Sequence, residues 1–329
     1  MGIAVLNCRK ILVAVLLAVL LTNSQPSAAD EAFKVRFTWK IKGEYAPFYM
    51  AQAKGLFDKA GLHVTMAEGA GGQAAMAALM QGQEDVVVAP GVYALSTVTK
   101  GMPIRLISIL HPAAPLALFS HADMPIKVPR DLEGKRIATG FDTFTNYINV
   151  LCHKNSVDCD KVSKVRVNGS LQQPMFMSRQ VDAFGGYLDV DWPLLKASTP
   201  AELTYIDLTK YGMIIPGMSV VTSNEVMAKR PEVLRKFLAA VTQGIEMTRA
   251  NVPEATDVLL KSWQVSPARN VVEEQIQSTV DFIPIIPNRP AGWIEGSTLD
   301  AALTNMLETK EIDDRKPLQE YFTNDFLPR

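Results

Sequence analysis

Short apolar runs alternate with helical patterns along residues 35–110, and the turns between them are brief. The apolar runs lie at residues 35–39, 62–66, 85–89 and 104–110, and the helical patterns at residues 47–60, 73–80 and 91–100. Uninterrupted apolar runs are typical of strands buried on both faces, and intervening helices allow such strands to run parallel. The first third of the chain is therefore predicted to be an α/β unit with a parallel sheet.

The alternation of strand and helix patterns stops at residues 112–129, which contain four prolines. It resumes with strands expected at 136–139, 165–167, 183 and 204–207 and helices at 145–154, 172–179 and from 191. The chain is expected to cross back near Pro216 and Gly217, before a helix over 231–250. Because 329 residues exceed one ordinary hydrophobic core, we predict two lobes. The first comprises residues 30–118 and 217–329, and the second comprises residues 119–216.

The first 29 residues are predicted to be a cleaved secretory signal peptide. Arg9 and Lys10 precede an apolar run over residues 11–21, and Ser27, Ala28 and Ala29 provide the small residues of a cleavage site. The alternative, a membrane anchor, needs about 20 apolar residues. A lipid anchor is disfavoured because Cys8 lies before the apolar run. We expect a soluble mature protein in the periplasm.

The charge balance argues against a nucleic-acid surface, which needs clustered basic residues. The whole chain has 33 basic and 34 acidic residues. Loss of residues 1–29 would remove Arg9 and Lys10 and no acid, which changes the formal charge from −1 to −3.

Two cysteines, Cys152 and Cys159, follow the predicted signal peptide and are separated by six residues. In an oxidising compartment such a pair predicts a structural disulfide. A metal pair with His153 is the alternative, but two thiols and one histidine at this spacing match no zinc pattern. We expect no cofactor and no metal site.

The common catalytic motifs are missing from the sequence: it contains no HExxH, GxSxG, GxxxxGK[ST] or GxGxxG. The four histidines are scattered singly and are expected at the surface or in turns; they are His63, His111, His121 and His153. A Schiff-base lysine or a pair of catalytic carboxylates leaves no local signature, so enzymatic activity stays open as an alternative.

Candidate ligand groups recur where the predicted strands end. Ligands of open α/β sheets bind beyond the carboxyl ends of the strands. The candidates are Trp39, Tyr45, Gly71, Gly72, Pro90, Tyr93, Thr143, Phe144, Tyr187 and Asp191. Several of these positions have a structural alternative: Trp39 as a core residue, Gly69–Gly72 as a plain turn, Thr143 with Thr145 as a helix cap, and Asp191 with its neighbour Asp189 as solvated carboxylates. Their recurrence at one edge favours a ligand cleft between the lobes.

Several stretches resemble periplasmic binding proteins that serve ABC importers for sulfonates, taurine and thiamine-precursor pyrimidines. The matching stretches are GEYAPFYMAQAKGLF (43–57), AGLHV (60–64), QGQEDV (81–86), DLEGKRI (131–137) and RPEVLRKF (230–237). The resemblance extends from about residue 33 to residue 250. It implies an α/β type II periplasmic binding protein fold: two doubly wound lobes, joined by a two-crossing hinge, that close on one small molecule.

The resemblance also implies roles for individual residues. In the pyrimidine-binding branch an aromatic residue after the first strand stacks on the ring, and Trp39 matches it. A tyrosine followed four positions later by an acid matches Tyr187 and Asp191, although Asp191 replaces the family's glutamate. The sulfonate branch grips its anion with helix N-termini, for which Gly71 and Gly72 are available. The cysteine-rich motif of the fungal pyrimidine synthases with this fold is absent from the sequence.

The leading hypothesis is therefore an exported, monomeric receptor that delivers a planar heteroaromatic molecule to an ABC permease and its ATPase. Binding of a sulfonate or another organic anion is the alternative within the family. A pyrimidine-synthase-like enzyme is the alternative from another class.

Overall fold

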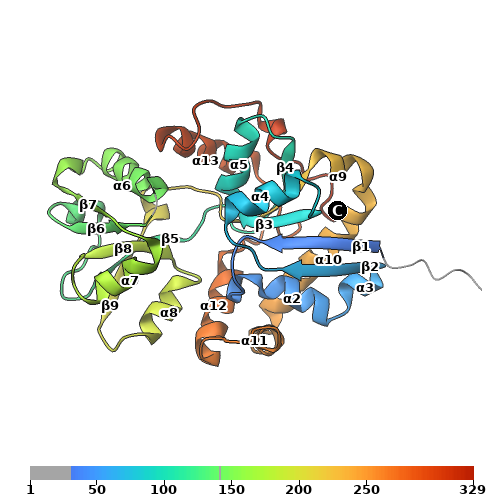
Figure 1. Ribbon diagram of the computed structural model, residues 1–329, viewed down its shortest axis with the longest axis horizontal. Helices are drawn as coiled ribbons and strands as arrows, with labels where there is room; N and C mark the ends of the chain where they lie inside the picture. The colour runs from blue at the N-terminus through green and yellow to red at the C-terminus, as the bar shows by residue number, and fades with distance from the viewer. Residues whose placement is uncertain (1–30, 141) are drawn as a thin grey trace, which may run out of the picture.

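Two five-stranded sheets, each flanked by helices, form the two halves of the molecule (Figure 1). The computed structural model describes residues 31–140 and 142–329, so the predicted signal peptide lies outside the described residues. We call the body around the first sheet lobe 1 and the body around the second sheet lobe 2. The predicted two-lobed α/β architecture is confirmed.

The sheet of lobe 1 has the strand order β2-β1-β3-β10-β4. Its strands are β1 (Glu31–Phe37), β2 (Leu62–Ala67), β3 (Val86–Pro90), β4 (Ile104–Ile109) and β10 (Met218–Ser223). β1 runs parallel to β2 and β3, whereas β10 is antiparallel to β3 and β4. The four strands predicted in residues 35–110 therefore run in one direction as expected, and the unpredicted β10 is inserted against them between β3 and β4. β10 enters from lobe 2, at the end where the parallel strands finish, and must therefore run against them.

Helices cover both faces of this sheet, because alternate residues of β3 point to opposite sides. Val86 and Val88 pack with α2, α3 and α10, whereas Val87 and Ala89 pack with α4, α5 and α13. The helices of lobe 1 are α2 (Ala46–Ala53), α3 (Leu56–Lys59), α4 (Gly72–Met80), α5 (Gly91–Thr99), α9 (Asn224–Lys229), α10 (Pro231–Ala250), α11 (Val252–Lys261), α12 (Arg269–Phe282) and α13 (Gly296–Glu308). The predicted helix over 47–60 is divided into α2 and α3 at Gly55, whose φ is 64°.

The sheet of lobe 2 has the strand order β7-β6-β8-β5-β9, and β5 runs antiparallel to β8 and β9. Its elements are β5 (Leu116–His121), β6 (Arg136–Thr139), α6 (Asp142–Lys154), β7 (Ser163–Arg166), α7 (Gly169–Met177), β8 (Ala183–Tyr187), α8 (Asp191–Ala197) and β9 (Leu203–Asp207). β5 was not predicted, because it lies inside the proline-rich stretch. The predicted lobe boundary after residue 118 falls within this strand. Short 3-10 helices occur at Gly43–Tyr45 (η1), Pro129–Leu132 (η2), Cys159–Lys161 (η3), Leu208–Tyr211 (η4) and Leu318–Glu320 (η5).

Two chain segments connect the lobes, and they are hydrogen-bonded to each other. The first joins β4 to β5, and the second joins η4 to β10. Ala114 N–H donates to Ile215 O at 2.6 Å, and Gly217 N–H donates to His111 O at 2.9 Å. The two crossings therefore run side by side between the lobes.

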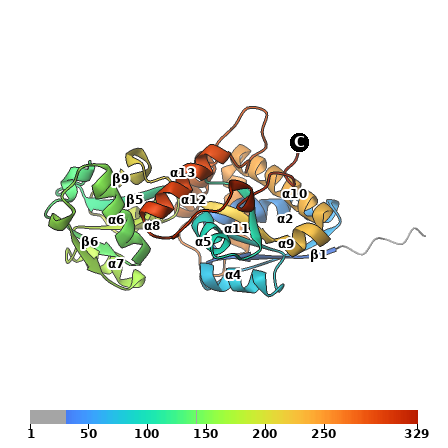
Figure 2. The same cartoon turned by 90° about the horizontal axis from the view of Figure 1, so that it is seen from above.

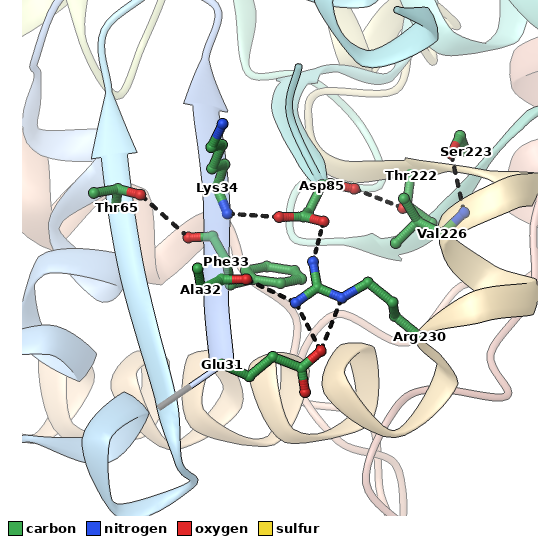
Figure 3. Close-up of polar contacts among 10 residues, drawn as sticks. All are labelled: Glu31, Ala32, Phe33, Lys34, Thr65, Asp85, Thr222, Ser223, Val226 and Arg230. Carbon is green, nitrogen blue, oxygen red and sulfur yellow. Dashed lines mark hydrogen bonds and ion pairs between the residues drawn. The ribbon is translucent and has the colours of Figure 1, made fainter. Parts of the chain in front are cut away.

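Arg230, between α9 and α10, binds residues at the amino ends of β1 and β3 (Figure 3). Its guanidinium donates to Glu31 Oε1 at 2.9 and 3.0 Å, to Ala32 O at 2.7 Å, and to the Asp85 carboxylate. Asp85 in turn accepts from Lys34 N–H at 2.8 Å. These contacts lie at the opposite end of β1 from the predicted ligand residues, so they serve the fold.

The predicted disulfide is not formed, because Cys152 and Cys159 are free thiols in the structure. Burial raises the pKa of Cys152 to about 12, and a hydrogen bond with Cys159 acts in the same direction. Cys159 Sγ is engaged by polar neighbours: it donates to Asn149 Oδ1 and accepts from Lys164 Nζ, both at 3.4 Å.

Within residues 31–140 and 142–329, no helix has the length and apolar character needed to cross a membrane.

Candidate ligand-binding site

In lobe 1 the predicted ligand residues gather at one edge of the sheet, because β1, β2 and β3 are parallel and end together. Trp39 lies just beyond β1 with its side chain 58% exposed. Gly71 N–H donates to Thr38 O at 2.8 Å, and Gly69 N–H donates to Trp39 O at 3.3 Å. A Cβ on Gly69 would lie 2.1 Å from a backbone oxygen of β1, so this approach requires glycine. The glycine loop is therefore fixed against the segment that carries Trp39.

Tyr93 joins the same edge from the first turn of α5. Its ring lies over Gly72, the first residue of α4, where a Cβ would approach the ring to 2.5 Å. The Tyr93 side chain is 41% exposed. Pro90 ends β3 and precedes α5. The structure thus brings Trp39, Gly71, Gly72, Pro90 and Tyr93 together.

In lobe 2 the predicted residues follow β6 and β8, which are also parallel. Thr143 and Phe144 lie in the first turn of α6, and the Phe144 ring packs against Gly185, where a Cβ would be 1.8 Å away. Tyr187 ends β8 and Asp191 begins α8. Tyr187 N–H donates to Asp191 Oδ2 at 2.8 Å.

Tyrosines of the two lobes face one another. Burial raises the pKa of Tyr187; Lys42 of lobe 1 opposes this shift, whereas Tyr93 of lobe 1 adds to it. Burial likewise raises the pKa of Tyr147 in α6, reinforced by Glu311 and by Tyr187 and Tyr93. The lobes meet here, because Val92 of α5 packs against the apolar cluster of lobe 2 that Phe144 and Tyr187 also contact.

Asp191 is the acceptor at this meeting point. It is half-buried, and burial raises its pKa, although the hydrogen bond from Tyr187 N–H opposes the shift. A carboxylate in partly dry surroundings is costly unless donors reach it. Of its two carboxylate oxygens, Oδ2 is the one that accepts from Tyr187 N–H.

Tyr45 lies behind the site rather than on its surface. Its side chain is buried, with 2% exposure, and its ring stacks on Phe37 at a centroid separation of 4.1 Å. Tyr45 therefore supports the end of β1, beyond which Trp39 lies.

The sequence analysis missed a second polar group beside these residues, composed of Lys42, Glu44, His111 and Asp189. His111 was expected at the surface but is 1% exposed, because it lies on the first crossing beneath α12 and contacts Thr279 O at 3.1 Å. Asp189, weighed as a solvated carboxylate, is 1% exposed. His121 is also buried, which corrects the same expectation. The only signal in the sequence was the position of Lys42 and Glu44 directly after the first strand.

Lys42 provides the positive charge in this group. Burial by itself would lower the pKa of Lys42, but the combined attraction of Glu44, Tyr45 and Asp189 exceeds that effect and raises the pKa. Lys42 therefore remains an ammonium ion facing both lobes.

Two surface depressions lie away from these residues. One is lined by Ile109, Pro112 and part of residues 293–299, and the other by Asp123, Arg179 and Glu202 together with small neighbours. Neither includes a predicted ligand residue. The candidate site is thus defined by converging side chains at the strand ends.

The fold is shared with solved binding proteins and with a solved enzyme. The aliphatic sulphonate binding protein SsuA from Escherichia coli has a TM-score of 0.70 at 14% identity, covering 88% of this chain and 91% of SsuA. The desulfurization enzyme DSZB has a TM-score of 0.64 at 14% identity, covering 89% of this chain and 97% of DSZB. At these identities the likeness concerns the fold alone.

Two curated relatives are similar over most of their length. The riboflavin-binding protein RibY of Chloroflexus aurantiacus is 23% identical over 93% of this chain and 88% of RibY. A protein of Haemophilus influenzae named for thiamine biosynthesis is 25% identical over 80% of this chain and 83% of that protein. The family model described as NMT1/THI5 like matches residues 42–255, which is more than half of the chain. The chain therefore belongs to the NMT1/THI5-like family.

Proposed function

We propose that the chain is an exported binding protein that holds a small planar heteroaromatic molecule between its lobes and delivers it to an ABC importer. One observation carries this proposal: aromatic side chains from both lobes converge at the strand ends, beside the Asp191 carboxylate. Trp39 and Tyr93 expose 58% and 41% of their surface there. Large aromatic side chains left exposed at one edge are typical of a surface that binds something.

Trp39 and Tyr187 would provide the faces on which the ligand ring stacks. Asp191 Oδ2 is held by Tyr187 N–H, and the carboxylate would accept hydrogen bonds from a ring amine. Phe144 and Tyr93 would border the ring, and Tyr45 would support Trp39 from the core. Two relatives, one named for riboflavin binding and one for thiamine biosynthesis, support a nitrogen heterocycle.

Export and delivery follow from the rest of the chain. The apolar leader in residues 1–29 supports secretion to the periplasm, and the family resemblance supports a permease and ATPase as membrane partners. The receptor would act as a monomer, with each lobe presenting one surface to the permease.

Sulfonate or organic-anion binding is the second candidate. The amino end of α4 at Gly71 and Gly72 lies at the same edge, and its backbone N–H groups could receive an anion. The SsuA fold supports this candidate. The nearby Asp189 and Asp191 carboxylates oppose it, because they repel an anion.

We further propose that the ligand is released unchanged. DSZB shows that this fold also hosts an enzyme. The thiols of Cys152 and Cys159 lie near the carboxyl end of α6. The candidate ligand residues of lobe 2 lie elsewhere: Phe144 is in the first turn of α6 and Tyr187 ends β8. Mass spectrometry of ligand recovered after prolonged incubation tests this point, and a new product would contradict it.

Calorimetry with a thiamine-precursor pyrimidine, riboflavin and an alkanesulfonate tests the binding proposal. A heteroaromatic ligand should bind, and Trp39→Ala should weaken it about 10- to 100-fold, since stacking on an aromatic is worth about 1–3 kcal/mol. Trp39→Phe should retain most of the affinity. Asp191→Asn should weaken binding, whereas Asp58→Asn, a change to an exposed carboxylate on α3, should not. Binding of sulfonates alone, unaffected by Trp39→Ala, would establish the second candidate instead.

A further inference from the structure

Three metal-ligating side chains converge where the lobes meet, and the proposed function does not use them. Glu44 lies in η1 of lobe 1, His111 lies on the first crossing, and Asp189 lies in the turn after β8 of lobe 2. His111 Nδ1 is 3.9 Å from Glu44 Oε1 and 3.7 Å from Asp189 Oδ2. The three donor atoms all lie within 4.8 Å of one another.

His111 presents a lone pair to the two carboxylates. Its Nε2 lies 3.1 Å from Thr279 O, and because a carbonyl only accepts, Nε2 carries the hydrogen. In the neutral ring Nδ1 is then an acceptor, and this buried atom has no hydrogen-bond partner. A histidine whose second nitrogen donates to a backbone carbonyl is the usual arrangement of a metal ligand.

Asp189 also has an acceptor atom without a hydrogen-bond partner, and Glu44 and Asp189 each direct one oxygen at His111 Nδ1. Glu44 directs Oε2 to Lys42, which leaves Oε1 facing His111. Asp189 is 1% exposed, and its Oδ1 has no hydrogen-bond partner. Three acceptors therefore face one another in a buried space, an arrangement that a cation would stabilise.

We propose that Glu44 Oε1, His111 Nδ1 and Asp189 Oδ2 bind one divalent transition-metal ion of the Zn²⁺ class. Zn²⁺ accepts mixed nitrogen and oxygen donors at about 2.0–2.2 Å, which places neighbouring donors roughly 3.4 Å apart. The two separations from His111 Nδ1, 3.7 and 3.9 Å, need to contract by a few tenths of an ångström, and the two carboxylate oxygens start within 4.8 Å of each other. The imidazole favours this class over Mg²⁺ or Ca²⁺, which prefer oxygen alone.

The ion would couple binding to lobe closure, because its ligands come from both lobes and from the crossing between them. All three side chains can bind the ion together only when Asp189 of lobe 2 lies next to Glu44 and His111. The ion therefore favours the closed arrangement by its differential affinity for that state. Lys42 opposes the ion by charge repulsion, so Lys42→Gln should tighten metal binding.

The test uses tag-free protein dialysed against a chelator. Titration with Zn²⁺ by calorimetry, and with Co²⁺ by absorption, should show one ion per chain. Glu44→Gln, Asp189→Asn and His111→Gln should each weaken binding at least tenfold. His121→Gln is the matched control: His121 is also buried, its Nε2 lies 3.1 Å from Phe176 O, and its Nδ1 has no partner. It belongs to no such donor group within the described residues, so His121→Gln should bind Zn²⁺ normally.

Thermal unfolding provides a second readout that does not depend on spectral bands. Zn²⁺ should raise the unfolding temperature of the parent protein and of His121→Gln, but not of His111→Gln, because only a bound ion stabilises the native state. Circular dichroism verifies that each variant is folded. The proposal is overturned by the absence of stoichiometric binding, or by equal Zn²⁺ affinity in His111→Gln and the parent protein.

Discussion

At the scale of single residues, Arg136 and Asp182 show how charge is used away from the candidate site. They join the amino ends of β6 and β8: Asp182 Oδ2 accepts from Arg136 N–H at 2.8 Å, and Oδ1 accepts from the guanidinium at 2.8 Å. Asp182 is 8% exposed, and the hydrogen bonds of Arg136 hold its pKa below the ordinary 3.8, against the effect of burial.

Asp182→Asn should therefore lower the free energy of unfolding at pH 7 by about 1–2 kcal/mol. The expected loss is no larger because Arg136 is partly exposed, and solvent weakens its attraction for Asp182. Since the folded-state pKa is lowered, the carboxylate stabilises the fold above pH 3.8 and loses that effect as the pH falls through the folded value. Denaturant unfolding at pH 7, 5 and 3.5 should show the difference from the parent protein shrinking at the lowest pH. Asp58→Asn should cost little throughout. A constant difference at all three pH values would refute the electrostatic account, and ligand affinity should not change.

At the scale of elements, α4 and α5 meet through Gly72 and Tyr93. Gly72→Ala should change the free energy of unfolding little, because the gain of about 1 kcal/mol in helix propensity offsets the cost of displacing the Tyr93 ring. Ligand affinity should fall several-fold as the ring moves. In a Tyr93→Ala background the clash is gone, so the same substitution should stabilise the protein by up to about 1 kcal/mol. Gly296→Ala, at the first position of α13 with its nearest contact at 3.3 Å, should stabilise in both backgrounds. If Gly72→Ala had the same effect with and without Tyr93, the proposed contact would be disproved.

The elements also show how far the sequence could predict the fold. Apolar runs and helical periodicity identified β3, β4 and α10, because each buries a continuous or periodic apolar face. β5 (LALFSH) and β10 (MSVVTS) were missed. Both contain polar residues at buried positions, and both adjoin the crossings that prolines and glycines mark. Two of their polar groups have partners distant in sequence: Thr222 Oγ1 donates to Asp85 O at 2.7 Å, and His121 Nε2 lies 3.1 Å from Phe176 O.

At the scale of the whole molecule, the candidate site depends on how the lobes face each other. Strand ends could be predicted, because parallel strands place their carboxyl ends at one edge. The grouping of Glu44, His111 and Asp189 could not, because it needs the paired crossing and the packing of α12 as well. Contacts also join the lobes at their rims: Lys154 of α6 pairs with Glu308 of α13 at 2.7 Å, and Figure 2 shows α13 extending from lobe 1 toward α6.

Gln275 of α12 provides the most buried of these contacts and the clearest test of closure. Its Oε1 accepts from Gly43 N–H of lobe 1 at 3.1 Å, and its Nε2 donates to Val190 O of lobe 2 at 2.9 Å. Gln275→Glu keeps the acceptor for Gly43 but removes the donor to Val190. The unpaired buried carbonyl costs about 1–3 kcal/mol, and repulsion between the new carboxylate and Val190 O adds to it; both arise only when the lobes are together.

We expect Gln275→Glu to weaken binding of the ligand identified by calorimetry about tenfold, although it alters no predicted ligand residue. Small-angle scattering should show that saturating ligand compacts the parent protein, and that the variant needs more ligand to reach the same radius of gyration. Gln277→Glu is the matched control, because it makes the same change at an exposed position of α12. Equal affinities for the two variants would show that the Val190 contact does not govern closure. Unchanged scattering of the parent protein at saturation would show that ligand binding does not close the lobes.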